Sequence, residues 1–447
     1  MKKIVSWLVA IGVIGFIAAY AGSSLLVKSR KAPEPSNVAE IKYDAALIEK
    51  GEYLARLSDC AACHTVAGDP EYAGGLAMQT PFGAIYSTNI TPDLETGIGS
   101  YSLTEFTNSV KHGVRKDDAP LYPAMPYTSY VLMSDDDMEA LYAYFMLKVE
   151  PVKKANADST FPWVMSMRWP VAYWQFLFSP IREFAADPAL SDVENHGAYL
   201  VEGPGHCGAC HTPRGLGYQE EALYNDGSNR FLSGALIDGW RAKSLRGEAQ
   251  GLKLWSEADI VEFLKTGRTD KVIAFGAMAD VVEHSSQYWT DEDLQATASY
   301  LKQLSPAPNK ILEFPDKKDV TTDKLLSGQY SDKGALLYVE HCTTCHRADG
   351  EGVPRIFPAL NMNSAVLANN AQSVIQVTLE GGKMPATPAD RMAFTMPGFN
   401  HLSDIEVAEI INFIRNSWNN TSPEVSAEDV AEIRGFLQNK APNVTLN

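Results

Sequence analysis

The amino-acid sequence predicts an all-α fold in which three tandem domains of one kind follow an N-terminal apolar helix. Three observations indicate this organisation. The pentad Cys-x-x-Cys-His occurs three times, and the three copies contain all six cysteines of the 447-residue chain. Each pentad lies between a short helical pattern and a longer amphipathic one. Almost no stretch shows the sustained alternation of apolar and polar residues that is typical of a half-buried β-strand.

The first element expected is a helix long enough to cross a membrane. Residues 4–27 carry no charge, and basic residues flank them on both sides. These residues correspond to about 36 Å of helix, and the apolar core of a secretory signal is shorter. Ala19-Tyr20-Ala21 has the small-x-small form of a cleavage site. We therefore interpret residues 1–30 as a signal peptide or a membrane anchor, and their length favours the anchor.

One domain is expected around each pentad, over residues 39–150, 185–306 and 322–425. The usual domain length of about 100–200 residues also gives three domains for this chain. The helical stretch before each pentad begins with a glycine: Gly51, Gly197 and Gly334. An N-cap residue with an acid three positions later predicts the start of each closing helix. These pairs are Ser134 with Asp137, Thr290 with Asp293, and Ser403 with Glu406.

The three pentads predict three covalently bound haem c groups. In this motif two thiols add to the vinyl groups of one porphyrin, and the adjacent histidine becomes an axial ligand of the iron. Structural zinc needs two cysteine pairs close together, whereas these pairs are more than a hundred residues apart. A redox dithiol is typical of a βαβ pattern, and none surrounds the motifs. The predicted attachment residues are Cys60 and Cys63, Cys207 and Cys210, and Cys342 and Cys345, with His64, His211 and His346 as proximal ligands.

A methionine recurs in the loop before each closing helix and is the predicted sixth ligand of the iron. The three methionines, Met125, Met278 and Met396, lie 7 to 12 residues before their N-cap residues. A thioether opposite an imidazole is the ligation typical of electron-transfer haem c. Each unit also contains a rival that the sequence leaves open, namely His112, His284 and Met384 respectively.

The surroundings of the proximal histidines and the C-terminal stretch give two further expectations. Each proximal histidine should donate its other ring N–H to a carbonyl oxygen, which fixes the tautomer. Pro213 and Pro358 lie in loops that are expected to present such a carbonyl. Residues 426–447 carry apolar residues at helical spacing and are expected to dock on this chain or on a partner.

The two connectors between the units differ in composition. Residues 161–184 contain three tryptophans and four phenylalanines, although linkers are normally polar. This connector is expected either to pack across the first two domains or to face a partner or a membrane. Residues 305–323 are rich in proline and lysine and predict an ordinary linker. The net charge of −17 argues against nucleic acid as a partner.

Between about residues 40 and 420 the chain resembles the three-haem cytochrome c subunits of membrane-bound bacterial dehydrogenases. This family includes the cytochrome subunits of alcohol, aldehyde and gluconate dehydrogenases. The resemblance rests on Thr80-Pro-Phe-Gly-Ala-Ile-Tyr-Ser-Thr-Asn-Ile-Thr-Pro-Asp93 and Lys111-His-Gly-Val114, on Ile237-Asp-Gly-Trp240, Trp255-Ser-Glu-Ala-Asp-Ile260 and Val281-Val-Glu-His-Ser285, and on Phe357-Pro-Ala-Leu360, Thr395-Met-Pro-Gly-Phe399 and Arg415-Asn-Ser-Trp418.

The resemblance implies three cytochrome c-like domains that transfer electrons at the periplasmic side of the bacterial cytoplasmic membrane. Electrons would come from the large subunit of a partner dehydrogenase, of the quinoprotein, flavoprotein or molybdenum type. They would pass from haem to haem and then to ubiquinone or another respiratory carrier. No segment resembles a pyrroloquinoline, flavin or molybdopterin domain, so substrate oxidation is expected in the partner.

Two other functions fit part of the pattern. A haem subunit that delivers electrons to a terminal oxidase would show the same haem count and the same anchor. A multihaem peroxidase would need an iron with an open sixth position, and the methionine in each unit disfavours it.

Overall fold

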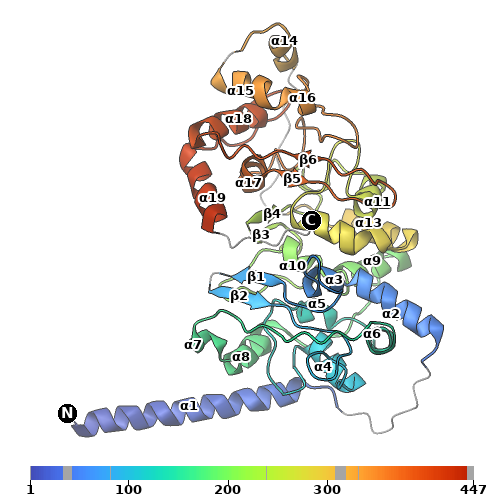
Figure 1. Ribbon diagram of the computed structural model, residues 1–447, viewed down its shortest axis with the longest axis vertical. Helices are drawn as coiled ribbons and strands as arrows, with labels where there is room; N and C mark the ends of the chain where they lie inside the picture. The colour runs from blue at the N-terminus through green and yellow to red at the C-terminus, as the bar shows by residue number, and fades with distance from the viewer. Residues whose placement is uncertain are drawn as a thin grey trace.

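The computed structural model describes residues 2–33, 43–80, 82–237, 239–307, 319–330 and 332–439, and this part of the chain is mostly helical (Figure 1). The first residues of the predicted domain 39–150, most of the predicted linker 305–323 and the end of the C-terminal stretch lie outside these ranges. Elements around the first pentad lie at the end of the molecule that carries α1. Elements around the third pentad lie at the other end, and those around the second lie between them.

We call these three parts unit 1, unit 2 and unit 3. The N-terminal helix is α1 (Lys2–Arg30). Unit 1 contains α2 (Ala45–Leu57), α3 (Cys60–His64), β1 (Ala77–Thr80), β2 (Gly83–Tyr86), α4 (Leu103–His112), α5 (Tyr127–Tyr130) and α6 (Asp135–Leu147), and the first connector contains α7 (Trp163–Ser166) and α8 (Trp169–Phe178).

The other two units repeat the plan of a helix before the pentad, a short pentad helix, a hairpin and a closing helix. Unit 2 contains α9 (Asp192–Glu202), α10 (Gly208–His211), β3 (Ala235–Ile237), β4 (Trp240–Ala242), α11 (Glu257–Thr266), α12 (Ala277–His284), the 3-10 helix η1 (Ser286–Tyr288) and α13 (Asp291–Gln303). Unit 3 contains α14 (Thr321–Leu326), α15 (Lys333–His341), α16 (Thr343–His346), α17 (Gln372–Glu380), β5 (Gly382–Lys383), β6 (Thr395–Met396), α18 (Asp404–Asn416) and α19 (Ala427–Asn439).

The strands form three two-stranded antiparallel hairpins, one in each unit. In unit 1, Ala77 pairs with Tyr86 and Thr80 with Gly83. The predicted all-α fold is therefore confirmed in its predominance of helices, but the prediction missed these hairpins. Strands of two to four residues are too short to show a period-two pattern.

The core of each unit is a crossing between the helix before the pentad and the closing helix, as α2 with α6, α9 with α13, and α15 with α18. The predicted N-caps are confirmed, because the Ser134, Thr290 and Ser403 side chains each accept a hydrogen bond from the backbone N–H three residues later. The three repeated glycines lie at the crossings. A Cβ on Gly51 would lie 2.0 Å from the carbonyl oxygen of Ala140, so only glycine permits this approach.

The C-terminal helix α19 packs on unit 3 rather than projecting from it. Val430 is fully buried in the unit 3 core, and Ile433 and Leu437 pack against that core. The Arg434 guanidinium donates to the Asp404 carboxylate at 2.7 Å. The described part of the C-terminal stretch therefore docks on this chain, which was one of the two outcomes expected from the sequence.

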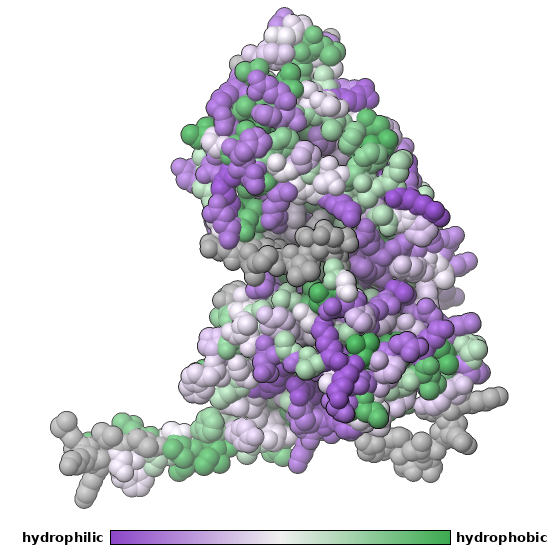
Figure 2. Space-filling model, viewed as in Figure 1, coloured by the Kyte–Doolittle hydropathy of each residue, from purple (hydrophilic) through white to green (hydrophobic). Residues whose placement is uncertain are grey.

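The end of α1 is fixed to unit 1 and to the first connector by a buried arginine. The Arg30 side chain is 6% exposed. It donates hydrogen bonds to the carbonyl oxygens of His112 at 3.0 Å and Ser179 at 2.6 Å. Beyond this end, α1 extends away from the folded units with apolar side chains along its length (Figure 2). The helix from Ser6 to Arg30 is long and apolar enough to cross a membrane.

The first connector packs across units 1 and 2, as one of the two interpretations predicted. The Trp174 indole donates to the carbonyl oxygen of Gly217 in unit 2 at 2.7 Å. The Gln175 amide is buried and donates to the carbonyl oxygen of Gly113 in unit 1 at 2.8 Å. Other apolar side chains of the connector, such as Trp163 and Phe176, are exposed.

Candidate haem sites

The proximal histidines share one hydrogen-bonding arrangement. The Nδ1 atoms of His64, His211 and His346 lie 2.6, 2.7 and 3.0 Å from the carbonyl oxygens of Thr88, Lys243 and Pro358. A carbonyl oxygen only accepts, so each Nδ1 carries the proton and each Nε2 keeps its lone pair. In that tautomer Nε2 is free to bind a haem iron as an axial ligand, so these residues fit the haem that the pentads imply.

The sequence predicted one of these carbonyls correctly and one wrongly. Pro358 does pair with His346, as predicted. The carbonyl oxygen of Pro213 instead accepts the backbone N–H of Glu221, at 2.9 Å. Lys243 and Thr88 were missed because they stand just after β4 and β2, and the hairpins that bring them to the histidines were not predicted. The signal available was the Asp238-Gly239 pair, which is typical of a two-residue hairpin turn.

The ionisation states of the pentad side chains also favour haem attachment over dithiol redox chemistry. Burial raises the pKa of the Cys60, Cys63, Cys207 and Cys342 thiols to about 12 and that of Cys210 to about 11. Redox-active Cys-x-x-Cys pairs have lowered pKa values instead. Burial also lowers the pKa of the His211 imidazole to about 4, so this ring is neutral at pH 7.

The three predicted methionines occupy different kinds of local structure. Met125 packs against the unit 1 core cluster that contains Ala61, and Cys60 packs against the same cluster. Met278 lies in the first turn of α12. Met396 lies in the short strand β6, paired with Gly382. The structure therefore brings Met125 and a pentad cysteine into one cluster, and the three ligand assignments remain predictions.

The rivals of these methionines differ in how far they are engaged elsewhere. The His112 ring is buried and its Nδ1 pairs with the carbonyl oxygen of Arg30, so this side chain secures the end of α1. Within the described residues, the Nε2 atom of His284 is buried without a hydrogen-bond partner. Met384 is buried, and its backbone N–H donates to the carbonyl oxygen of Phe394 at 3.1 Å.

Units 1 and 2 are joined by two equivalent tyrosines. The Tyr53 hydroxyl, from the helix before the first pentad, donates to Asp293 and accepts the N–H of Thr290 at the start of α13. In return, the Tyr199 hydroxyl donates to Asp137 and accepts the N–H of Ser134 at the start of α6. Each unit thus inserts its tyrosine into the N-terminus of the other unit's closing helix. Leu57, Leu200, Trp289 and Leu294 form an apolar cluster at the same joint.

This joint brings two pentads close together. The Cys63 thiol of unit 1 lies near enough to the Cys210 thiol that a charge on Cys210 raises the pKa of Cys63. Helix α12, which begins with Ala277 and Met278, packs on α3, the pentad helix of unit 1. The residues that would hold the first and second haems therefore lie close together at this joint.

Units 2 and 3 are joined on the opposite side of the second site. The Lys243 backbone holds His211, while the Lys243 ammonium donates to the hydroxyl of Ser364 in unit 3 at 3.1 Å. The backbone N–H of Arg241 donates to the hydroxyl of Ser373 at 2.7 Å. The Arg268 guanidinium, whose side chain is 2% exposed, donates to the carbonyl oxygen of Pro385 at 2.7 Å. Unit 2 therefore connects the other two.

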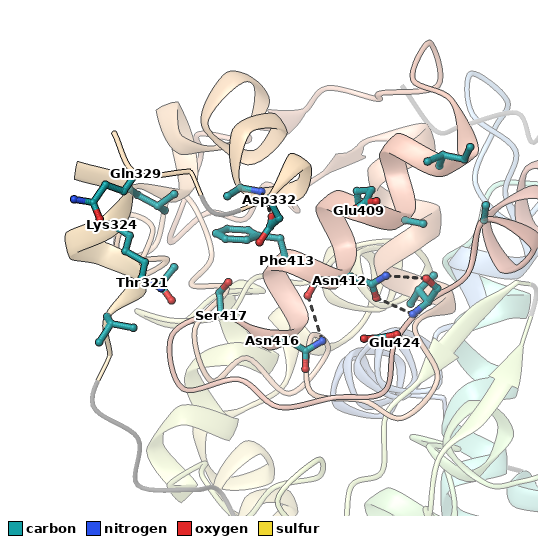
Figure 3. A pocket seen from close by; sticks show the side chains of 17 residues that line it. Thr321, Lys324, Gln329, Asp332, Glu409, Asn412, Phe413, Asn416, Ser417 and Glu424 are labelled. Atoms are coloured by element: carbon teal, nitrogen blue, oxygen red, sulfur yellow. Dashed lines mark hydrogen bonds between the residues drawn. The ribbon is translucent and has the colours of Figure 1, made fainter. Parts of the chain in front are cut away.

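A separate cavity of about 700 Å³ opens in unit 3 between α14, α15 and α18 (Figure 3). Its wall contains Lys324, Asp332, Glu409 and Phe413, and the Asn412 amide at its edge donates to the carbonyl oxygen of Val425 at 2.8 Å. No pentad residue and none of the candidate methionines lines it. The cavity therefore lies outside the haem sites.

The chain has three pentads in three linked helical units, and the histidine of each pentad is hydrogen-bonded to a backbone carbonyl oxygen. These features define a multihaem c-type cytochrome. The family model "Cytochrome c" matches residues 48–147, 196–305 and 331–418, one match for each unit. The chain belongs to the family of cytochrome c subunits of bacterial dehydrogenases.

Three relatives support this assignment. The chain is 49% identical to the cytochrome c subunit of the quinone alcohol dehydrogenase of Gluconobacter oxydans, over 88% of this chain and 83% of the relative. It is 48% identical to the gluconate 2-dehydrogenase cytochrome c subunit of Pantoea cypripedii, over 89% of this chain and 91% of the relative. It is 34% identical to the fructose dehydrogenase cytochrome subunit of Gluconobacter japonicus, over 92% and 87%.

Proposed function

We propose that this chain takes electrons from a partner dehydrogenase at the periplasmic side of the bacterial cytoplasmic membrane and passes them to ubiquinone or another respiratory carrier. It carries three covalently bound haem c groups and serves as the electron-transfer subunit of a dehydrogenase complex. The observation that carries the proposal is the series of three pentads in three directly joined units. The name of the Gluconobacter oxydans relative, which includes a quinone, supports a quinone as acceptor.

The proposed axial pairs are His64 with Met125, His211 with Met278, and His346 with Met396. When bound, haem supplies one-electron redox chemistry. The protein contributes the carbonyl oxygens that hold each imidazole in one tautomer and orientation. A histidine and a methionine together leave no open position on the iron, which suits electron transfer rather than peroxide chemistry.

The proposed anchor is α1, retained in the mature chain. Cleavage after Ala21 would remove the carbonyl oxygen of Ala19, which accepts the Tyr173 hydroxyl at 2.7 Å. It would also remove Phe16 and Tyr20, whose rings pack edge-on against Trp169 of α8. These contacts stabilise only a chain that keeps its N-terminal helix, and they support an anchor over a cleaved signal.

Purification of the chain from its native membranes in detergent tests this function. We expect it to be isolated with a large dehydrogenase subunit, and the substrate of that subunit should reduce all three haems. Intact-mass measurement of the purified chain should show the N-terminal helix still attached. Isolation with an oxidase core would contradict the dehydrogenase assignment, and haem reduction followed by fast turnover of peroxide would favour the peroxidase alternative.

Leucine substitutions test the methionine ligands. Because loss of a thioether ligand opens the sixth position, we expect M125L, M278L and M396L each to let one of the three reduced haems bind carbon monoxide. The matched controls M384L and H284Q should leave all three haems unreactive. Carbon monoxide binding in M384L but not in M396L, or in H284Q but not in M278L, would reassign that ligand.

A further inference from the structure

The first connector exposes an apolar strip that its packing does not explain. The strip contains Trp163 on α7, which is 77% exposed, and Phe176 and Leu177 on α8, each 66% exposed. Val164, Met165 and Ile181 extend it. A group of large apolar side chains exposed together is typical of an interface with a protein or a membrane. We call these six residues the connector strip.

The rest of the same segment is already used in packing. Ala172 and Gln175 face the interior, Trp169 packs against α1, and Trp174 binds unit 2. Phe176 and Leu177 are therefore the large apolar side chains of α8 that the described units leave exposed.

The two arginines that flank α8 are engaged by other parts of the chain. The Arg168 guanidinium stacks over the Tyr122 ring at 4.3 Å and donates to the carbonyl oxygen of Pro120 at 3.2 Å. The Arg182 guanidinium donates to the carbonyl oxygen of Leu223 at 3.0 Å. Helix α8 itself, from Trp169 to Phe178, has no charged residue. The chemistry that fits such a face is hydrocarbon with an interfacial border, where tryptophan is enriched.

The length of α1 brings this face to the bilayer. Ring contacts with α8 begin at Phe16, and a Cβ on Gly12 or Gly15 would meet open space. Residues 2–15 alone give about 21 Å of helix, which is shorter than the roughly 30 Å hydrocarbon core of a bilayer. If α1 crosses the membrane, the bilayer must extend along the part of α1 that lies beside α8 (Figure 1).

A groove between the end of α1 and α8 is also lined largely by apolar side chains. It has a volume of about 240 Å³. Its walls include Leu26, Phe176 and Ile181, and Arg30 and Ser179 also line it. These two polar residues are hydrogen-bonded to each other, because the Arg30 guanidinium donates to the Ser179 hydroxyl at 3.0 Å. An open groove of this kind matches an acyl chain that enters from the bilayer.

We infer that the connector strip lies in the lipid of the same bilayer that α1 crosses, so that α7 and α8 form an interfacial platform beside the anchor. This inference rests on the proposed retention of α1. The connector strip would contact phospholipid hydrocarbon. This contact would determine which side of unit 1 faces the membrane. Arg30 and Tyr173 hold the anchor and the platform in one fixed relation.

Quenching by brominated lipid tests the inference in the full-length protein with its haems. Single cysteines placed by I14C, W163C, F176C and L326C are labelled with a fluorophore, and the protein is inserted into phosphatidylcholine nanodiscs with or without brominated acyl chains. All four native side chains are exposed, so folding should be retained, and the haem spectrum checks this. Leu326 lies on α14, at the end of the molecule far from α1, and is the matched control.

We expect brominated lipid to reduce fluorescence at positions 14, 163 and 176 but not at position 326. Quenching at position 14 alone would overturn the inference while leaving the anchor intact, and a partner protein would then be the better occupant of the strip. Absence of quenching at position 14 as well as at 163 and 176 would overturn the anchor, and the inference with it.

Discussion

The double substitution C207S/C210S should remove the haem of unit 2 and bring dehydrogenase-driven quinone reduction down to background. Haem content should fall from three groups to two in each chain. The reason is the position of unit 2, because within the described part of the chain each extensive contact between units includes one of its elements: η1 with α2, α12 with α3, and β4 with α17. We therefore expect a path through more than one haem to pass through the second.

The measurement is haem quantification, followed by rapid mixing with the dehydrogenase substrate and a ubiquinone analogue. Any haem that the partner reduces directly should still be reduced, and a haem beyond the gap should remain oxidised. The variants C60S/C63S and C342S/C345S also lose one haem each and are the matched controls for haem loss. The variant M278L separates electron transfer from folding, because it should keep its haem attached while its ligation changes. Unchanged quinone reduction in a folded C207S/C210S chain would contradict the proposed path.

The joint between units 1 and 2 shows why local pattern predicted each unit but not their assembly. Tyr53 and Tyr199 occupy equivalent positions two residues after the repeated glycine, and each reaches a helix more than sixty residues away. The equivalent residue of unit 3 is Leu336, which is 41% exposed and has no hydroxyl to donate. Unit 3 is joined instead through Lys243, Arg241 and Arg268, none of which belongs to a repeated motif.

Helix starts and haem attachment were predictable because both are encoded within a few residues. Ser134, Thr290 and Ser403 cap their helices by bonding to a backbone N–H only three positions away. The carbonyls that hold the histidines are encoded less locally. Pro358 stands 12 residues after His346 and was predicted, whereas Lys243 stands 32 residues after His211 and reaches it only through a hairpin that the sequence pattern was too short to reveal.

Alanine substitution of the repeated glycines is expected to have the second large effect. It should lower the free energy of unfolding, whereas the same substitution in an exposed helix raises it. In an exposed helix, glycine to alanine normally stabilises by about 1 kcal/mol. At Gly51, Gly197 and Gly334 the new Cβ would lie 2.0, 2.0 and 2.4 Å from the carbonyl oxygens of Ala140, Ala296 and Glu409. These atoms are backbone, so the two helices must separate. We expect G51A, G197A and G334A each to lower the free energy of unfolding by about 3 kcal/mol.

Alanine at Gly435 in α19 is the matched control, because a Cβ there would meet open space. Chemical denaturation followed by circular dichroism should show G435A at or above the stability of the parent chain and the three crossing variants below it. Since Gly51 and Gly197 also precede the tyrosines of the joint, G51A and G197A should weaken the contact between units 1 and 2 as well. G334A should not, because Leu336 makes no such bond. Stability equal to that of G435A would show that the crossing can widen at little cost, and the close approach of these helices would then not explain the repeated glycine.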